Sequence, residues 1–186
     1  IMNANNQKIS INFPKGIELF IKREDLLHLI ISGNKFRKLK YNLQEAKQLG
    51  KSKLLTFGGA FSNHIVAVAG AGKEFGFETV GIIRGEELLH KIHENPSLQL
   101  AQELGMQFQF IDRTTYRDKS NSKFIESLQK SYPDFYLIPE GGTNDLAIKG
   151  CEEILTNDDK TTFNYICCAI GTGGTISGII NSTTEK

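Results

Sequence analysis

Strand-like apolar runs alternate with helix-like periodic segments along most of this chain, and no other feature constrains its fold as strongly. The expected strands cover residues 53–59, 79–85, 106–112, 135–142 and 165–170. Helical patterns lie between them, at 62–76, 95–105, 121–132 and 146–155. Alternation of this kind is typical of parallel sheets with helices on both faces. The sequence therefore predicts an α/β fold built on open parallel sheets.

The composition argues against two classes of function, nucleic-acid binding and membrane binding. The 186 residues include 22 basic and 21 acidic side chains, for a net charge of +1. A nucleic-acid or membrane binder would carry a basic excess, so we expect neither partner. The cysteine count of three is odd, and no signal peptide or membrane span is visible. A reducing cytoplasm is the expected location.

Two loops have the form of ligand-binding loops in parallel sheets, because each follows an expected strand and leads into a helix. They are "FGGAFSN" at 57–63 and "AIGTGGT" at 169–175. The second loop lacks the third glycine of a dinucleotide fingerprint, since Ile176 stands there, and "GAGKE" at 70–74 lacks the Ser or Thr of a Walker loop. The pattern of residues 171–175 therefore allows two interpretations: a phosphate-binding loop, or a tight turn without a ligand.

The side chains of the first loop also allow two interpretations. Ser62 and Asn63 are good helix N-caps, and a cap is an ordinary role for such a pair. A cap at the carboxyl end of a strand can also face a ligand. Both interpretations stay open on these residues alone.

A short basic cluster, "SGNKFRKLK" at 32–40, precedes a helical pattern. Lys35 would lie in the first helical turn, where the helix dipole disfavours a cation. A lowered pKa is what an amine nucleophile requires. Lys38 would share the face of Lys35 and could contact a phosphate. A solvated basic helix face is the alternative, and we expect Arg37 and Lys40 to be ordinary helix charges.

Four motifs in order, "SGNKFRKL", "GGAFSNH", "PEGGTN" and "GTGGT", resemble the fold-type II pyridoxal-phosphate enzymes. Within that group the chain resembles the 1-aminocyclopropane-1-carboxylate deaminase / D-cysteine desulfhydrase family, over about residues 22–180. The resemblance implies two domains. Residues 1–50 and 143–186 would belong to the larger cofactor-binding domain, and 51–142 to a smaller inserted domain. It also implies a homodimer.

The resemblance assigns a role to each motif. Lys35 would be the Schiff-base lysine of pyridoxal 5'-phosphate, preceded by Asn34 as in the family. Lys38 and the segment Gly171, Thr172, Gly173, Gly174 and Thr175 would hold the phosphate. Asn63 would bond the ring oxygen of the cofactor. Ser62 would lie near the substrate carboxylate and assist proton transfer.

The implied reaction converts a small amino acid to an α-keto acid and ammonia, with sulfide released if the substrate is D-cysteine. His64 after Ser-Asn favours D-cysteine over the cyclopropane amino acid, if it binds substrate; a helix-surface histidine without a role is the alternative. Two other functions are considered: a β-replacement synthase of the same fold type, and a non-catalytic phosphate-ligand module. The family's segment for the pyridine nitrogen has no counterpart here, so we expect an incomplete portion of a longer chain.

The remaining candidates favour structural interpretations. His90, His93, Glu87 and Glu94 suggest a metal only weakly, because "EELLHKIHEN" resembles a solvated amphipathic turn. Cys167 and Cys168 lie in an apolar run and are expected to be buried. Asp112, Arg113 and Asp118 are expected to be loop charges.

Overall fold

A computed structural model of the protein describes residues 3–183. Its strands are β1 (Asn6–Lys8), β2 (Phe20–Lys22), β3 (Lys53–Gly58), β4 (Glu78–Arg84), β5 (Met106–Ile111) and β6 (Phe135–Ile138). Its α-helices are α1 (Asn34–Gln48), α2 (Asn63–Phe75), α3 (Pro96–Glu103), α4 (Arg113–Arg117), α5 (Ser122–Ser131), α6 (Asp145–Cys151), α7 (Asn157–Thr162) and α8 (Gly174–Thr183). Short 3-10 turns include Glu86–Leu88, Ile92–Glu94 and Glu140–Gly142.

The larger sheet is parallel throughout and has the strand order β5-β4-β3-β6. Its central strand, β3, is paired on both sides, with Leu55 opposite Val80 on β4 and opposite Leu137 on β6. The prediction of a parallel α/β fold is confirmed, and four of the five expected strands form this sheet. A separate antiparallel pair, β1-β2, was not predicted.

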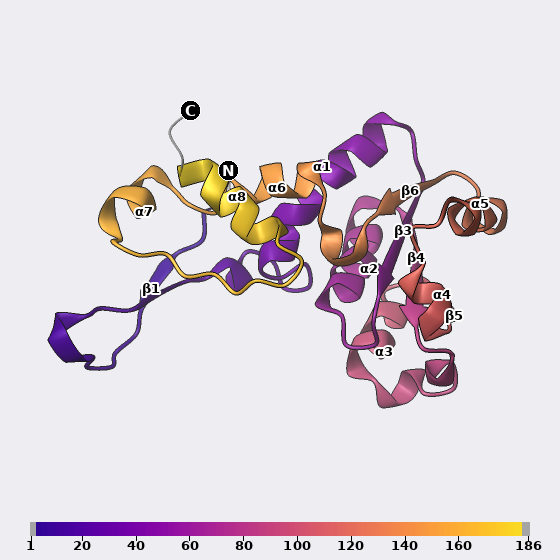
Figure 1. Cartoon of the computed structure of the whole chain (residues 1–186), viewed down its shortest axis with the longest axis horizontal. Helices are drawn as coiled ribbons and strands as arrows, with labels where there is room; N and C mark the ends of the chain where they lie inside the picture. Colours follow the sequence, from indigo (N-terminus) through magenta and orange to yellow (C-terminus); the bar gives the residue numbers. More distant parts are fainter. Residues whose placement is uncertain (1–2, 184–186) are drawn as a thin grey trace.

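Helices cover both faces of the larger sheet. Successive residues of a strand point to opposite faces, so neighbouring residues of β3 pack against different helices. Leu54 packs with residues of α1, α2 and α3 in one core cluster. Leu55, the next residue along β3, packs with Tyr116 of α4 and Leu128 of α5 in the other. Figure 1 places this sheet at one end of the molecule, β1 and α7 at the other, and α1 with α6 between them. The division into two domains stays a prediction.

The loop before α2 has the predicted capping geometry. Ser62 is the N-cap and accepts a hydrogen bond from the amide of Ile65 at 3.4 Å. Gly76 ends the helix with φ of 77°, a conformation that favours glycine. At Gly58 a Cβ would lie 2.5 Å from a side-chain carbon of Ile65, so the strand end and the helix approach more closely than a side chain would allow.

Close helix packing brings the basic cluster of α1 near the glycine turn before α8. A Cβ at Gly150 of α6 would lie 2.0 Å from the carbonyl oxygen of Arg37 on α1. A Cβ at Gly178 of α8 would lie 2.5 Å from Cβ of Cys151 on α6. Small residues therefore permit the two contacts that fix α1, α6 and α8 relative to one another.

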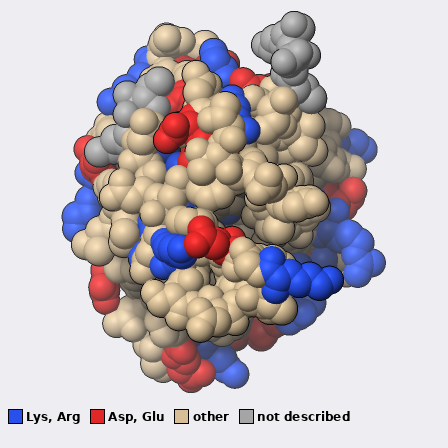
Figure 2. Space-filling view, turned by 90° about the vertical axis from the view of Figure 1, so that its left-hand side faces the viewer, with Lys and Arg blue, Asp and Glu red and all other residues tan. Residues whose placement is uncertain are grey.

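The expected strand at 165–170 is wrong, since the structure has no regular secondary structure there. No strand within residues 3–183 pairs with it, and a strand requires a neighbour for its backbone hydrogen bonds. The expected burial of both cysteines is wrong for the same reason: Cys167 is exposed and Cys168 half-buried. On the face shown in Figure 2, charges of both signs are scattered among large uncharged areas.

The expectation that Arg37 and Lys40 are ordinary helix charges is also wrong. Arg37 is 1% exposed and donates to both carboxylate oxygens of Glu24, at 2.8 and 3.0 Å. Lys40 pairs with Glu153 at 2.6 Å. Because the guanidinium of Arg37 is buried, its charge needs a carboxylate partner.

Some expected loop charges have structural roles as well. Asp112 is the N-cap of α4 and accepts bonds from the amides of Thr114 and Thr115. Arg113 pairs with Glu87 at 2.7 Å on the surface. No helix in the described part of the chain is long and apolar enough to cross a membrane.

Candidate active site

A glycine precedes the helix α1 that carries most of the basic cluster, as the sequence indicated. Gly33 has φ of 62° and precedes Asn34, the first helical residue, so Lys35 lies in the first turn. The side-chain amide of Asn34 donates to Oγ1 of Thr175 at 2.7 Å, and its oxygen accepts from the amine of Lys35 at 3.2 Å. Asn34 therefore connects Lys35 to the start of α8.

Lys38 lies one turn further along α1 and is 2% exposed. Its amine donates to Oγ1 of Thr143 at 2.9 Å, to the carbonyl of Gly141 at 3.2 Å and to Oγ1 of Thr172 at 3.3 Å. These partners are neutral oxygens, and no carboxylate of residues 3–183 lies within hydrogen-bond distance of the Lys38 amine. A buried cation surrounded by hydroxyls is suited to an anionic ligand.

The glycine turn before α8 can supply backbone amides to the same place. Gly173 has φ of 86°, and α8 begins at Gly174. A Cβ at Gly174 would lie 3.0 Å from Oγ1 of Thr143 and 3.2 Å from the amine of Lys38. The absence of a side chain thus keeps the space beside Lys38 open, next to a helix N-terminus that favours anions.

A cavity of about 200 Å³ opens between this turn and α1. It is lined by Asn34, Lys35, Lys38, Gly141, Ala169, Ile170, Gly171, Thr172, Gly173, Thr175 and Ile176. Nearly all residues predicted to hold the cofactor phosphate therefore surround one space. Gly174 does not line it but lies next to Lys38.

A second cavity, of about 470 Å³, shares Asn34 and Lys35 with the first. Asn63, at the start of α2, borders it together with Ile30, Ser32, Gly33, Val66, Pro96, Ser97 and Leu100. Ser62 is not among the lining residues, since its hydroxyl caps α2. Lys35 thus lies at the junction of a phosphate-sized polar cavity and a larger one that reaches Asn63.

Burial lowers the pKa of Lys35, and the nearby positive charge of Lys38 lowers it further. Burial also lowers the pKa of Lys38. A lowered pKa increases the neutral fraction of an amine near neutral pH, and the neutral form is the nucleophile. Lys35 meets this requirement and borders both cavities.

His64 is not on the helix surface: it is 2% exposed, so that alternative is wrong. Its Nε2 lies 2.8 Å from Oγ1 of Thr56 on β3, behind the Ser62–Asn63 turn. It lines neither cavity. Burial, followed by the charges of Lys35 and Lys38, lowers the pKa of His64 to about 3. The imidazole is therefore neutral at physiological pH.

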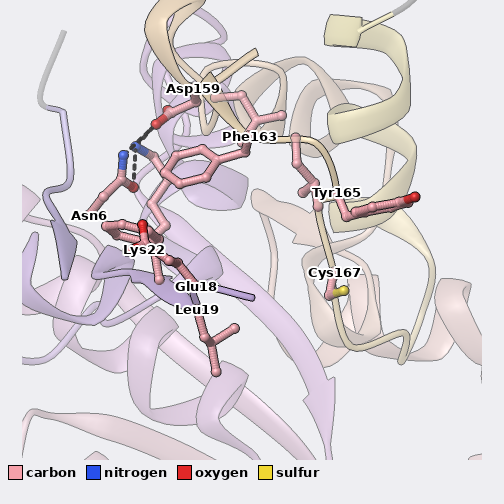
Figure 3. Close-up of a pocket in the computed structure, with 11 residues that line it drawn as sticks. Asn6, Glu18, Leu19, Lys22, Asp159, Phe163, Tyr165 and Cys167 are labelled. Carbon is pink, nitrogen blue, oxygen red and sulfur yellow. Dashed lines mark hydrogen bonds and ion pairs between the residues drawn. The ribbon is translucent and has the colours of Figure 1, made fainter. Parts of the chain in front are cut away.

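A third hollow, of about 180 Å³, lies between β2 and the segment after α7 (Figure 3). Its polar side chains bond one another: Lys22 pairs with Asp159 at 2.7 Å, and Asn6 donates to Asp159 at 2.6 Å. The other lining residues are mostly apolar, including Leu19 and Phe163. The charges of Lys22 and Asp159 are thus paired with each other, and the exposed thiol of Cys167 also borders this hollow.

Sequence reasoning missed Thr143 and Thr56 as parts of the site, and gave Gly141 no role. Thr143 and Gly141 belong to "PEGGTN", which follows β6 at the same sheet edge as the loop after β3. Because loops after parallel strands meet at one end of the sheet, their positions in the sequence could have predicted that Thr143 and Gly141 lie in the site. Thr56 lies inside an apolar strand, and nothing in its sequence context distinguishes it.

Comparisons with known proteins agree on one family. A family model described as pyridoxal-phosphate dependent enzyme matches residues 10–186. A putative 1-aminocyclopropane-1-carboxylate deaminase of Thermotoga maritima is 36% identical over 171 residues, which cover 88% of this chain and 53% of the relative. A bifunctional, mitochondrial D-cysteine desulfhydrase/1-aminocyclopropane-1-carboxylate deaminase of Arabidopsis thaliana is 32% identical over 182 residues, covering 89% and 45%.

Among solved structures, that of an ACC deaminase homologue matches with a TM-score of 0.75 and 26% identity, covering 98% of this chain and 58% of the other. The chain thus spans about half the length of the relatives that it matches. Family model, relatives and fold agree with one another. The chain belongs to the family of pyridoxal-phosphate dependent enzymes.

Proposed function

We propose that this protein is a pyridoxal-phosphate-dependent lyase or deaminase that converts a small amino acid to an α-keto acid and ammonia. The observation that carries the proposal is the position of Lys35. Its amine has a lowered pKa and lies between a polar, phosphate-sized cavity and a larger cavity that reaches Asn63. At this position Lys35 would bind the cofactor's aldehyde.

The residues present fit the cofactor. A phosphate ester that carries nearly two negative charges requires several donors, and Lys38, Thr172, Thr175 and Thr143 supply an amine and hydroxyls at one place. The glycines leave room beside them. Asn63 lines the second cavity and would bond the ring oxygen.

When bound, the cofactor supplies an electron sink that stabilises negative charge on the substrate carbon. Lys35 would serve as the base at that carbon. With D-cysteine it would take the Cα proton, and sulfide would leave. The cyclopropane amino acid has no Cα proton, so its ring would open by another route.

The turn at Ser62 and Asn63 would bind the substrate carboxylate. It begins α2, where amides free of intrahelical bonds favour an anion. The hydroxyl of Ser62 would assist proton transfer near this carboxylate. The names of the two relatives, which refer to the cyclopropane amino acid and D-cysteine, support these as the first substrates to test.

Cofactor absorbance tests the proposal. Addition of pyridoxal phosphate should give a visible absorbance band, and Lys35→Ala should abolish it. Lys47→Ala is the matched control, because Lys47 is an exposed lysine on the same helix. A colourless full-length protein after addition of the cofactor, or an undiminished band in Lys35→Ala, would refute the proposal.

Product assays then separate the candidate reactions. Keto acid with sulfide from D-cysteine indicates a desulfhydrase, and ammonia from the cyclopropane amino acid indicates a deaminase. Exchange of a β-substituent without keto-acid release would indicate a β-replacement synthase instead. Sedimentation of the protein would test the expected homodimer.

A further inference from the structure

Two buried side-chain polar atoms within residues 3–183 have no hydrogen-bond partner: Nδ1 of His64 and Nδ2 of Asn95. Asn95 uses its other atom to cap α3, where it accepts from the amides of Ser97 and Leu98. His64 caps nothing. A buried polar atom without a partner is costly, so the retained imidazole calls for a physical reason.

Two hydrogen bonds meet at one hydroxyl beside His64. Oγ1 of Thr56 is hydrogen-bonded to the carbonyl of Ile138 at 2.8 Å. Nε2 of His64 lies 2.8 Å from the same hydroxyl oxygen, and which of these two atoms donates depends on the imidazole tautomer. Phenylalanine would fill the same space without an unpaired nitrogen, but it could not form a hydrogen bond with Thr56.

These bonds join three elements at the carboxyl ends of the sheet strands. Thr56 belongs to β3, Ile138 ends β6, and His64 lies in the first turn of α2. The ring of His64 also contacts the turn that follows β6, since a Cβ at Gly142 would lie 3.1 Å from Cε1. Gly141, in the same turn, accepts from Lys38. His64 therefore lies between the Ser62–Asn63 turn and the turn that contacts Lys38.

We infer that His64 is a neutral positioning residue that fixes the Asn63 turn relative to the Gly141–Gly142 turn through its bond to Thr56. This inference rests on the proposed function, because the two turns would hold opposite ends of the cofactor. Burial disfavours protonation of the imidazole, and so do the charges of Lys35 and Lys38 on α1, while a hydrogen bond with the Pro139 backbone partly opposes them. His64 therefore sets a distance and does not exchange protons.

Thr56 provides the mutational test. Thr56→Val removes the hydroxyl that bonds His64 and should weaken pyridoxal-phosphate binding about tenfold in an absorbance titration, whereas Thr56→Ser should bind within about twofold of wild type. Thr79→Val is the matched control for loss of a buried threonine, since Thr79 is 3% exposed on the neighbouring strand and pairs near the opposite end of the sheet. It should leave cofactor affinity unchanged.

Nitrogen-15 NMR of the imidazole tests the same inference without cofactor or activity. The imidazole of His64 should stay neutral, with no titration between pH 5 and 8. A titrating imidazole would overturn the inference. So would wild-type cofactor affinity in Thr56→Val. Failure of the wild-type protein to bind the cofactor would instead count against the proposed function, which separates the two failures.

Discussion

Asn34 donates to Oγ1 of Thr175 at 2.7 Å, and this bond joins the first residue of α1 to the first turn of α8. The two residues are 141 positions apart in the chain. Because Asn34 also accepts from Lys35, the bond fixes the candidate nucleophile relative to the glycine turn. The start of each helix thus borders the cavity proposed for the phosphate.

The first prediction concerns this bond. Thr175→Val should weaken pyridoxal-phosphate binding about fivefold, because one hydrogen bond of about 1 kcal/mol is lost between the two helices. Thr175→Ser should bind nearly as well as wild type. Equilibrium titration of the cofactor absorbance measures both, and equal affinity of the valine and serine variants would contradict the prediction.

Lys38 should be the main contributor to phosphate affinity. Lys38→Met keeps the length of the side chain but removes a charge-assisted bond of about 2 kcal/mol, so affinity should fall roughly 30-fold. The same change should raise the pKa of Lys35, since the charge of Lys38 now lowers it. The pH midpoint for cofactor attachment should therefore move upward; an unchanged midpoint would contradict this account.

Arg37 should matter for folding and not for chemistry. Arg37→Met leaves Glu24 half-buried without its partner, and the free energy of unfolding should fall by about 3 kcal/mol. The control is Arg113→Ala, which removes an exposed pair with Glu87 and should cost less than about 1 kcal/mol. Denaturant titration compares the two variants. Equal losses of unfolding free energy would contradict the prediction that the buried Arg37–Glu24 pair contributes more than the exposed pair.

Asp159 should make stability depend on acidic pH. Burial opposes its ionisation, but hydrogen bonds from Lys22, Asn6 and Thr156 prevail and lower its pKa from 3.8 to about 2. A lowered folded-state pKa contributes about 2 kcal/mol of stability above pH 4, and this contribution is lost as pH falls toward 2. Asp159→Asn should flatten unfolding free energy across that range; an unchanged slope would contradict the assignment.

Local sequence patterns predicted much of the fold. Alternation placed β3, β4, β5 and β6, and glycines marked the end of α2 and the entry to α1, because these features depend on nearby residues. The segment 165–170 was mispredicted because an apolar run forms a strand only where a neighbour pairs with it. The burial of Arg37 was missed because it depends on Gly150, more than 100 residues away.

In the site, too, nearby sequence predicted some residues, whereas contacts between distant segments were missed. Lys35, Lys38, Asn63 and the turn at 171–175 were all proposed from sequence, since each lies in a recognisable loop or helix start. The Thr56–His64 bond could not be foreseen, because it depends on how α2 packs on β3 and β6. Burial of the imidazole is a property of that packing and not of the Ser-Asn-His triplet.

The central claim is that Lys35 binds the cofactor covalently. Borohydride reduction of the protein with pyridoxal phosphate, followed by proteolysis and mass spectrometry, tests it most directly. The account predicts a pyridoxyl group on Lys35 and none on Lys38, although both amines line the same cavity. Label on Lys38 in place of Lys35, or no label on α1, would contradict it.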